Sequence, residues 1–278
     1  MDFSELTERY PVIFLDAFGV LKNASGVLPG SAAVLDRLRS QGKDIYILTN
    51  DASRSPEQMA RSYVHAERGT LVPAEKILSS GLLASEFLAE TVGEGPVAYL
   101  GTASSAYFIE QVGLRALPVE ECRTQDSPKA IAILDDEGFD WSIALNRCLN
   151  LLREAEIPVV VANADLTYPV RGNEVALAAG SLGRLLEAAL GRDLIFFGKP
   201  DPRMFSSAFA RAATQHPGLR PGDVLMVGDT LETDILGGAR FGLDTALVLS
   251  GNTPPDRAEE MIEISGIRPN HVCSSILS

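Results

Sequence analysis

Four continuous apolar runs in this 278-residue chain each end in polar residues, and this pattern constrains the fold more than any other feature. The runs are followed by Asp16, by Thr49-Asn50, by Gly198-Lys199-Pro200 and by Gly228-Asp229. A continuous apolar run is expected of a strand that is covered on both faces, as strands of parallel sheets usually are. Ligands of open parallel sheets bind beyond the carboxyl ends of the strands. The pattern therefore predicts one site built at four neighbouring strand ends of one sheet.

Strand-like and helix-like segments alternate along the chain, which favours βαβ units. We predict an α/β fold whose core is a Rossmann-like, doubly wound parallel sheet. Residues 81–177 carry a β-α-β-α-β pattern of their own, so we interpret them as an inserted α/β cap. The core is then formed by residues 1–80 and 178–278. In this scheme the helix expected at 182–190 and the strand expected at 194–197 belong to the core.

Two local segments have simple interpretations. A helix is expected to begin at Ser55-Pro56, because proline favours the first helical position, and to reach about His65. The acidic run Asp135-Asp136-Glu137 follows a strand expected at 130–134. Consecutive side chains after a strand point in different directions, so we interpret this run as a solvated turn rather than a metal site.

Composition narrows the class of function. The formal net charge is −13 and the pI about 4.7, and no basic stripe is visible, so nucleic acid is not an expected partner. No run approaches the roughly 20 apolar residues that cross a bilayer, so no membrane association is expected. The acidic start Met1–Glu5 lacks the pattern of a secretory signal, which favours the cytoplasm. The cysteines Cys122, Cys148 and Cys273 lack metal-type spacing and are expected to be reduced.

Asp16 has the chemistry of a nucleophile for phosphorus, because a carboxylate can attack a phosphoryl group directly. The attack brings negative oxygens towards a negative side chain, and a divalent cation is the usual remedy. Mg²⁺ prefers carboxylate, carbonyl and water ligands. The predicted ligands are Asp16, the backbone carbonyl of Phe18 and Asp229. Asp234, one helical turn further on, would orient the waters of the ion or the side chain of Lys199. Taken alone, Asp16 or Asp229 could equally be a helix cap that follows a strand.

The other strand ends offer groups for the phosphoryl oxygens. Lys199 would neutralise the charge on Asp16 and on the transferring group, since an ammonium is a compact point charge. The hydroxyl of Thr49 and the amide or backbone N–H of Asn50 would bind non-bridging oxygens. Taken singly, each of these three residues is also compatible with a surface or turn position.

Three further residues are candidate contacts for the substrate. Arg54 closely follows the second strand end, and an exposed arginine at a helix start is the alternative. Asp165 and Tyr168 lie where the cap is expected to return to the core. The alternative for them is an Asx turn before Pro169.

These motifs, in this order, resemble those of the haloacid dehalogenase superfamily of phosphohydrolases. The matching segments are Asp16–Val20, Leu48–Asn50, Gly198–Pro200 and Gly228–Asp234. The insertion resembles the larger α/β cap of the branch that contains the N-acetylglucosamine-phosphate and 4-nitrophenyl phosphatases. The resemblance implies a Mg²⁺-dependent phosphatase that forms an aspartyl-phosphate and acts on a small phosphorylated metabolite, such as a sugar phosphate. It also makes a homodimer formed through the cap compatible with the sequence.

The sequence departs from the family pattern at Phe18, where most of these phosphatases carry a second aspartate. By resemblance, that aspartate protonates the leaving oxygen and later activates water, and Phe18 can do neither. The enzyme could favour good leaving groups or use an acid from its cap. The alternatives are a weakly catalytic or non-catalytic binder of phosphometabolites and a phosphotransferase. True dehalogenases also have an aromatic residue here, but they act without Mg²⁺ and lack the acidic pair Asp229 and Asp234.

Overall fold

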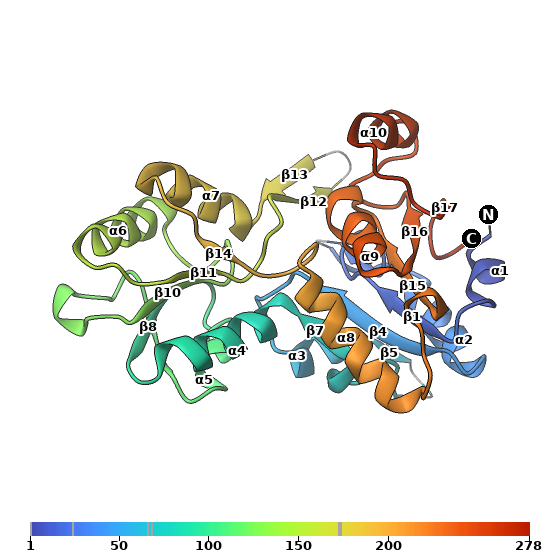
Figure 1. Ribbon diagram of the computed structural model, residues 1–278, viewed down its shortest axis with the longest axis horizontal. Helices are drawn as coiled ribbons and strands as arrows, with labels where there is room; N and C mark the ends of the chain where they lie inside the picture. The colour runs from blue at the N-terminus through green and yellow to red at the C-terminus, as the bar shows by residue number, and fades with distance from the viewer. Residues whose placement is uncertain (1, 24, 66, 68, 172–173) are drawn as a thin grey trace.

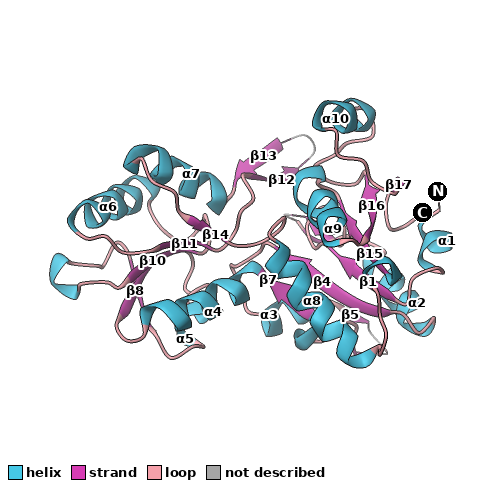
Figure 2. Ribbon diagram, viewed as in Figure 1, coloured by secondary structure: helices cyan, strands magenta, loops and turns pink. Residues whose placement is uncertain are grey.

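The structure is a computed structural model of the chain, and it describes residues 2–23, 25–65, 67, 69–171 and 174–278. Two α/β units lie side by side, and both chain termini lie on the core (Figure 1). Each unit has a parallel sheet flanked by helices (Figure 2). This arrangement confirms the predicted fold class, a Rossmann-like core with an inserted α/β cap.

The core contains a six-stranded sheet in the order β17-β16-β15-β1-β4-β7, in which every pairing is parallel. Its strands are β1 (Val12–Leu15), β4 (Asp44–Thr49), β7 (Ile77–Ser79), β15 (Val224–Gly228), β16 (Asp244–Val248) and β17 (His271–Cys273). The helices around it are α1 (Phe3–Thr7), α2 (Ser31–Ser40), α3 (Pro56–Ala60), α8 (Pro202–Gln215), α9 (Leu236–Phe241) and α10 (Ala258–Ser265).

The unbroken apolar run of β1 is explained by apolar packing on both faces of the sheet. Ile13 packs in the same cluster as Leu35 of α2. Phe14, the next residue, points to the opposite face and packs in the cluster that holds Phe205 of α8. Every residue of β1, β4 and β15 is buried, as a strand covered on both sides requires.

The cap contains a second parallel sheet, in the order β14-β11-β10-β8-β9. Its strands are β8 (Pro96–Leu100), β9 (Arg115–Pro118), β10 (Ala130–Ile133), β11 (Val159–Val161) and β14 (Ile195–Phe196). Its helices are α4 (Ser80–Val92), α5 (Tyr107–Glu110), α6 (Trp141–Glu154) and α7 (Ala179–Leu190). An antiparallel hairpin, β12 (Thr167–Arg171) and β13 (Glu174–Leu177), lies between this sheet and the core in Figure 1.

The placement predicted for the helix at 182–190 and the strand at 194–197 is wrong. Ile195 of β14 pairs with Val160 of the cap strand β11, and Leu182 of α7 packs in the apolar cluster of the cap. The cap sheet therefore includes β14, and the predicted return to the core at residue 178 comes too early. An apolar run that fits a strand covered on two faces fits either parallel sheet equally, so the pattern could not choose between them.

The helix that begins at Ser55 is shorter than predicted. Ser55 and Gln58 form a reciprocal capping box with Pro56 in the first turn, as expected of a helix start. The helix ends at Ala60 rather than near His65, and a small antiparallel pair, β5 (Val64–His65) and β6 (Gly69–Thr70), follows. Tyr63 is buried in the core cluster beside β4, and this burial takes the chain off the helical path.

The remaining elements are short. They are the strand pair β2 (Lys22–Asn23) and β3 (Gly26–Val27), 3-10 turns at Ala74–Lys76, Thr124–Asp126 and Pro221–Asp223, and a π-turn at Leu231–Ile235. Over the described ranges, no helix has the length and apolar character needed to cross a membrane. At the C-terminal end of the chain, α10 is followed by β17, which pairs with β16 at the edge of the core sheet.

Candidate active site

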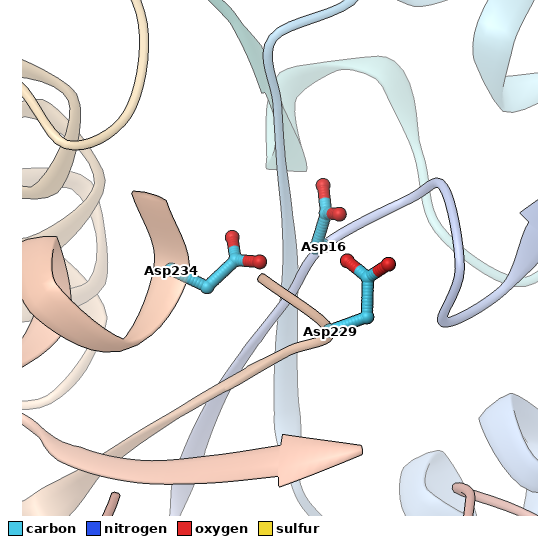
Figure 3. A group of neighbouring side chains, drawn as sticks. All are labelled: Asp16, Asp229 and Asp234. Atoms are coloured by element: carbon cyan, nitrogen blue, oxygen red, sulfur yellow. The ribbon is translucent and has the colours of Figure 1, made fainter. Parts of the chain in front are cut away.

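Three carboxylates converge beyond the carboxyl ends of β1 and β15. The backbone N–H of Asp16 donates to the carbonyl of Val227 at 2.9 Å, so Asp16 extends the ladder between the two strands. One carboxylate oxygen each from Asp16, Asp229 and Asp234 lie within 4.8 Å of one another, and all three residues are buried. Figure 3 shows the three carboxyl groups pointing towards a common centre. Two of the predicted strand ends thus meet as expected.

Lys199 supplies the positive charge of this cluster. Its Nζ donates to Asp16 Oδ1 at 2.6 Å and to Asp234 Oδ1 at 2.7 Å. Burial alone would lower the pKa of Lys199, but the two carboxylates raise it above its usual range. The lysine therefore stays charged. The prediction that Lys199 follows a strand of the core sheet is wrong. Lys199 instead lies in the segment that leaves the cap strand β14.

Asp229 has a different environment from the two carboxylates bound to Lys199. Its Oδ2 accepts the backbone N–H of Asn252 at 2.6 Å, and no ion pair reaches it within the part of the chain that the structure describes. Burial raises the pKa of Asp229 well above its usual value, and the neighbouring Asp16 and Asp234 add to the effect. A carboxylate with excess negative charge around it is suited to a bound cation.

The backbone leaves no room for a side chain next to this carboxylate. A Cβ on Gly19, whose φ is +75°, would lie 2.1 Å from Asp229 Oδ2, and a Cβ on Gly251 would lie 1.9 Å from the same atom. Glycine at both positions lets two loops close around Asp229. The carboxylate is thus fixed in place before any ligand binds.

Asp234 is fixed by the turn after β15. Its Oδ2 accepts the backbone N–H of Thr230 at 3.1 Å, while its Oδ1 accepts from Lys199. Burial raises its pKa to about 7 against the opposing effect of Lys199. Since both oxygens have protein partners, the geometry supports the expected role of orienting Lys199.

Asn50 joins the second strand end to Lys199. Its Oδ1 accepts the backbone N–H of Lys199 at 2.7 Å, and its Nδ2 donates to the Lys199 carbonyl at 3.1 Å and to Asp165 Oδ1 at 2.9 Å. A Cβ on Gly198, at a φ of +112°, would lie 2.4 Å from Asn50 Oδ1. The side-chain amide therefore positions the lysine segment instead of being free for the phosphoryl group. Thr49 Oγ1 accepts the backbone N–H of Asp51 at 3.2 Å.

A cavity of about 380 Å³ lies between this cluster and the cap. Eight of the predicted site residues line it: Asp16, Phe18, Thr49, Asn50, Arg54, Asp165, Tyr168 and Lys199. Arg54 is exposed at its edge. Asp165 accepts from Asn50, and burial raises its pKa to about 6. Asp229 and Asp234 lie beneath the cavity rather than on its surface.

The turn predicted for Asp135-Asp136-Glu137 is less solvated than expected, because only Glu137 is exposed. Asp135 and Asp136 are partly buried and line the cavity from the cap side. Burial raises the pKa of Asp135 to about 7, with a further contribution from Asp136. The sequence gives no signal for this placement, because it depends on how the cap meets the core.

Phe18 lies at the junction of core and cap. Its ring meets the ring of Tyr168 edge-to-face, with 6.1 Å between centroids. The Nζ of Lys22 lies 4.3 Å from the Phe18 centroid and donates to Asp51 Oδ2 at 2.9 Å. Sequence reasoning missed Lys22 and Asp51. A lysine four residues after Phe18 is the only signal, and by itself it is weak.

Comparisons with known proteins agree with this geometry. A model described as haloacid dehalogenase-like hydrolase matches residues 13–115, and one described as HAD-hydrolase-like matches residues 196–278. Chronophin of Bos taurus is 31% identical over 262 residues, covering 92% of this chain and 86% of its own.

Two solved structures are also similar. A "possible sugar phosphatase" of the HAD superfamily from Cytophaga hutchinsonii is 48% identical, covers 100% of this chain and 98% of its own, and has a TM-score of 0.93. A glycerol phosphate phosphatase from Mycobacterium tuberculosis, solved in complex with magnesium, is 26% identical. It covers 98% of this chain and 76% of its own, with a TM-score of 0.77.

Proposed function

This chain belongs to the haloacid dehalogenase-like hydrolases and is a phosphatase of small metabolites, and from that premise we propose a Mg²⁺-dependent monoesterase that forms an aspartyl-phosphate on Asp16. One observation carries the proposal. The Asp16 carboxylate lines a small-molecule cavity, 2.6 Å from the ammonium of Lys199 and within 4.8 Å of two further buried carboxylates. A sugar phosphate-like compound is the substrate class that we favour.

The magnesium complex of the mycobacterial relative and the carboxylate cluster of this chain both support magnesium as the cofactor. We assign its ligands to Asp16, Asp229 and the carbonyl of Phe18. Asp229 fits because it is buried without an ion pair in the described residues. Asp234 would orient the groups around the ion rather than bind the ion directly, because its Oδ1 already accepts from Lys199. The bound ion would neutralise the charge that builds up as phosphate approaches carboxylate.

The side chains of the site supply the remaining steps. A carboxylate oxygen of Asp16 attacks phosphorus, and the bond from phosphorus to the leaving oxygen breaks. Lys199 offsets the negative charge of the transferring group, and the Thr49 hydroxyl and Asn50 backbone lie where they can donate to its oxygens. Arg54, Asp165 and Tyr168 contact the rest of the substrate. Water then attacks phosphorus, which releases phosphate and restores Asp16.

The assembly and the compartment stay predictions. We retain the cytoplasm as the compartment and a homodimer as a compatible assembly, with no nucleic acid or membrane partner. The cavity between core and cap fits a small molecule better than a macromolecule.

The test is the rate of release of phosphate from 4-nitrophenyl phosphate and from a panel of sugar phosphates, with Mg²⁺ or with EDTA. We expect turnover only with the metal, and a loss of about 10⁴-fold or more in Asp16→Asn, as for the removal of other reacting groups. Asp193→Asn, an exposed carboxylate outside the cavity, is the matched control. If a correctly folded protein shows no turnover but gains thermal stability with a sugar phosphate, the chain is a binder. The replacement of the expected acid by Phe18 favours this second candidate.

A further inference from the structure

Position 18 leaves one step of the proposed hydrolysis without a proton donor. When the bond from phosphorus to an alkoxide breaks, the leaving oxygen needs a proton, and a positioned acid contributes about 10²–10⁴-fold to the rate. Phe18 has no proton to give. The inference below rests on the proposed phosphatase function and concerns the residue that supplies this proton.

The surroundings of the Phe18 ring restrict the choice. On the cap side the ring meets Tyr168, with 6.1 Å between centroids. The hydroxyl of Tyr168 lies 3.3 Å from Asp136 Oδ2. Phe18, Tyr168 and Asp136 all line the same cavity. A path of direct contacts therefore leads from the place of the missing acid to a carboxyl group of the cap.

We propose that Asp136 of the cap, positioned by Tyr168, donates the proton to the leaving oxygen. As Asp16 bonds to phosphorus and the ester bond breaks, the carboxyl proton of Asp136 passes to the leaving oxygen. Asp136 is left as a carboxylate. It then takes a proton from the water that attacks the aspartyl-phosphate, so the acid form returns when phosphate and free Asp16 are released.

The turn that carries Asp136 is held rigidly. The backbone N–H of Asp136 donates to Asp135 Oδ1 at 2.9 Å, and its carbonyl accepts the indole N–H of Trp141 at 2.8 Å. These bonds hold the backbone of the turn at Asp136 and do not use its carboxyl oxygens. Tyr168 is then the side chain that orients the carboxyl.

The charges around Asp136 favour its acid form. Burial raises the pKa of Asp136, although the hydrogen bond from Tyr168 opposes the shift. The charged and titratable groups that face it are Asp135 and Glu137 of its own turn, Tyr168 of the hairpin, and Asp51 of the core loop with its partner Lys22. Most of these groups are acidic, and the ammonium of Lys22 is bonded to Asp51. The net surroundings thus disfavour the carboxylate.

Two other candidates are less suited. Asp165 accepts from Asn50 at 2.9 Å, and Asn50 holds the backbone of Lys199, so this carboxylate is already engaged on the core side. Lys22 lies over the Phe18 ring, is bonded to Asp51 and does not line the cavity. Neither offers a free acid to the cap side, where the leaving group must lie.

The experiment uses two substrates of similar size that differ in leaving-group basicity, phenyl phosphate and 4-nitrophenyl phosphate, with the full-length protein and Mg²⁺. For Asp136→Asn we expect kcat/KM on phenyl phosphate to fall about 10²-fold, and on 4-nitrophenyl phosphate by less than about threefold, because nitrophenolate leaves without a proton. Glu156→Gln, an exposed carboxylate of the cap outside the cavity, is the control and should change neither value.

Rescue separates proton donation from a structural role. Phe18→Asp added to Asp136→Asn should restore most of the rate on phenyl phosphate, because it returns a carboxyl to the first motif. The wild-type rate on this substrate should fall as pH rises through the pKa of Asp136, and Asp136→Asn should lose that fall. Tyr168→Phe should lower the phenyl phosphate rate by about tenfold, which is the size of one lost hydrogen bond to an acid.

Several outcomes would overturn the assignment. Equal losses on both substrates in Asp136→Asn would mean a binding or structural role. If the loss confined to phenyl phosphate occurred in Asp135→Asn or Lys22→Met and not in Asp136→Asn, proton donation would be assigned to Asp135 or Lys22 instead. Absence of turnover on 4-nitrophenyl phosphate in the wild type is a different result, because it would defeat the proposed function itself.

Discussion

At the core side of the cavity, Asp16 and Asp234 share the buried ammonium of Lys199 at 2.6 and 2.7 Å. At the cap side, Asp135 and Asp136 have no ion pair within the described residues, and their pKa values are raised by burial. We therefore propose two functions for the same residue type in one cavity. On the core side, the ammonium of Lys199 compensates two carboxylates, which suits attack, and Asp229 without an ion pair in the described residues suits a bound cation. On the cap side, no such cation compensates Asp135 and Asp136, which suits the donation of a proton.

The core side and the cap side of the cavity also differ in what holds their carboxylates in place. The core carboxylates follow adjacent parallel strands, so the hydrogen bonds of the sheet set their spacing. The cap carboxylates follow β10 of a different sheet, and they reach the cavity only because cap and core pack together. Variants on the core side should therefore affect both stability and catalysis, and variants on the cap side should act more selectively.

Replacement of Lys199 should have the largest effect. Lys199→Met leaves the carboxylates of Asp16 and Asp234 buried without compensation, so we expect a loss of about 3–5 kcal/mol in the free energy of unfolding. Turnover should also disappear. Urea unfolding at neutral pH measures the first effect, and Lys129→Met, an exposed lysine of the cap, is the control. Unchanged stability would show that the core carboxylates are not held by this ion pair.

Replacement of Asp165 tests whether this residue acts with the core side of the cavity or with the proton donors of the cap side. Its carboxylate accepts from Asn50, which in turn holds the backbone of Lys199. In Asp165→Asn we expect kcat/KM to fall by about tenfold, the size of one charge-assisted hydrogen bond. The fall should be equal for phenyl and 4-nitrophenyl phosphate, with Asp193→Asn as the control. A loss confined to phenyl phosphate would instead place Asp165 among the proton donors and blur the distinction between core and cap.

Replacement of Asp135 should have the smallest effect, and it concerns stability. The pKa of Asp135 is about 7 in the folded protein and about 3.9 in an unfolded chain. A raised pKa contributes stability that is complete below the unfolded value and is lost as pH rises through the folded value. Asp135 is only partly buried, so solvent screening leaves a fraction of the full shift, roughly 1–2 kcal/mol. Asp135→Asn removes this loss, so its Tm at pH 8 should exceed that of the wild type by about 4 °C.

The same gain should be smaller at pH 5, where the folded protein still holds the proton. Thermal unfolding at the two pH values, with Glu156→Gln beside it, measures the difference. An equal gain in Tm at both pH values would mean that the pKa of Asp135 is not raised above that of a surface carboxyl group.

The strand-end pattern predicted much of the site. Asp16, Asn50 and Asp229 follow core strands as expected, and Lys199 meets Asp16 as expected. The origin of Lys199 was not predictable, because the apolar run before it fits the cap sheet and the core sheet equally. The acidic turn at Asp135 was also misplaced, since local sequence does not report which turns a second domain will cover.

The sequence alone determined the α/β class, the parallel strands and the identity of the groups that could handle phosphate, because these depend on periodicity and side-chain chemistry within short segments. Only the tertiary structure decided that β14 joins the cap sheet and that Tyr168 meets Phe18. The same holds for the partial burial of Asp135 and Asp136 in the cavity that Asp16 also lines. The Phe18–Tyr168 contact and the burial of the acidic turn arise from the packing of one domain on the other. The pairing of β14 with β11 depends on which of two parallel sheets takes up that apolar run. No local pattern encodes either outcome.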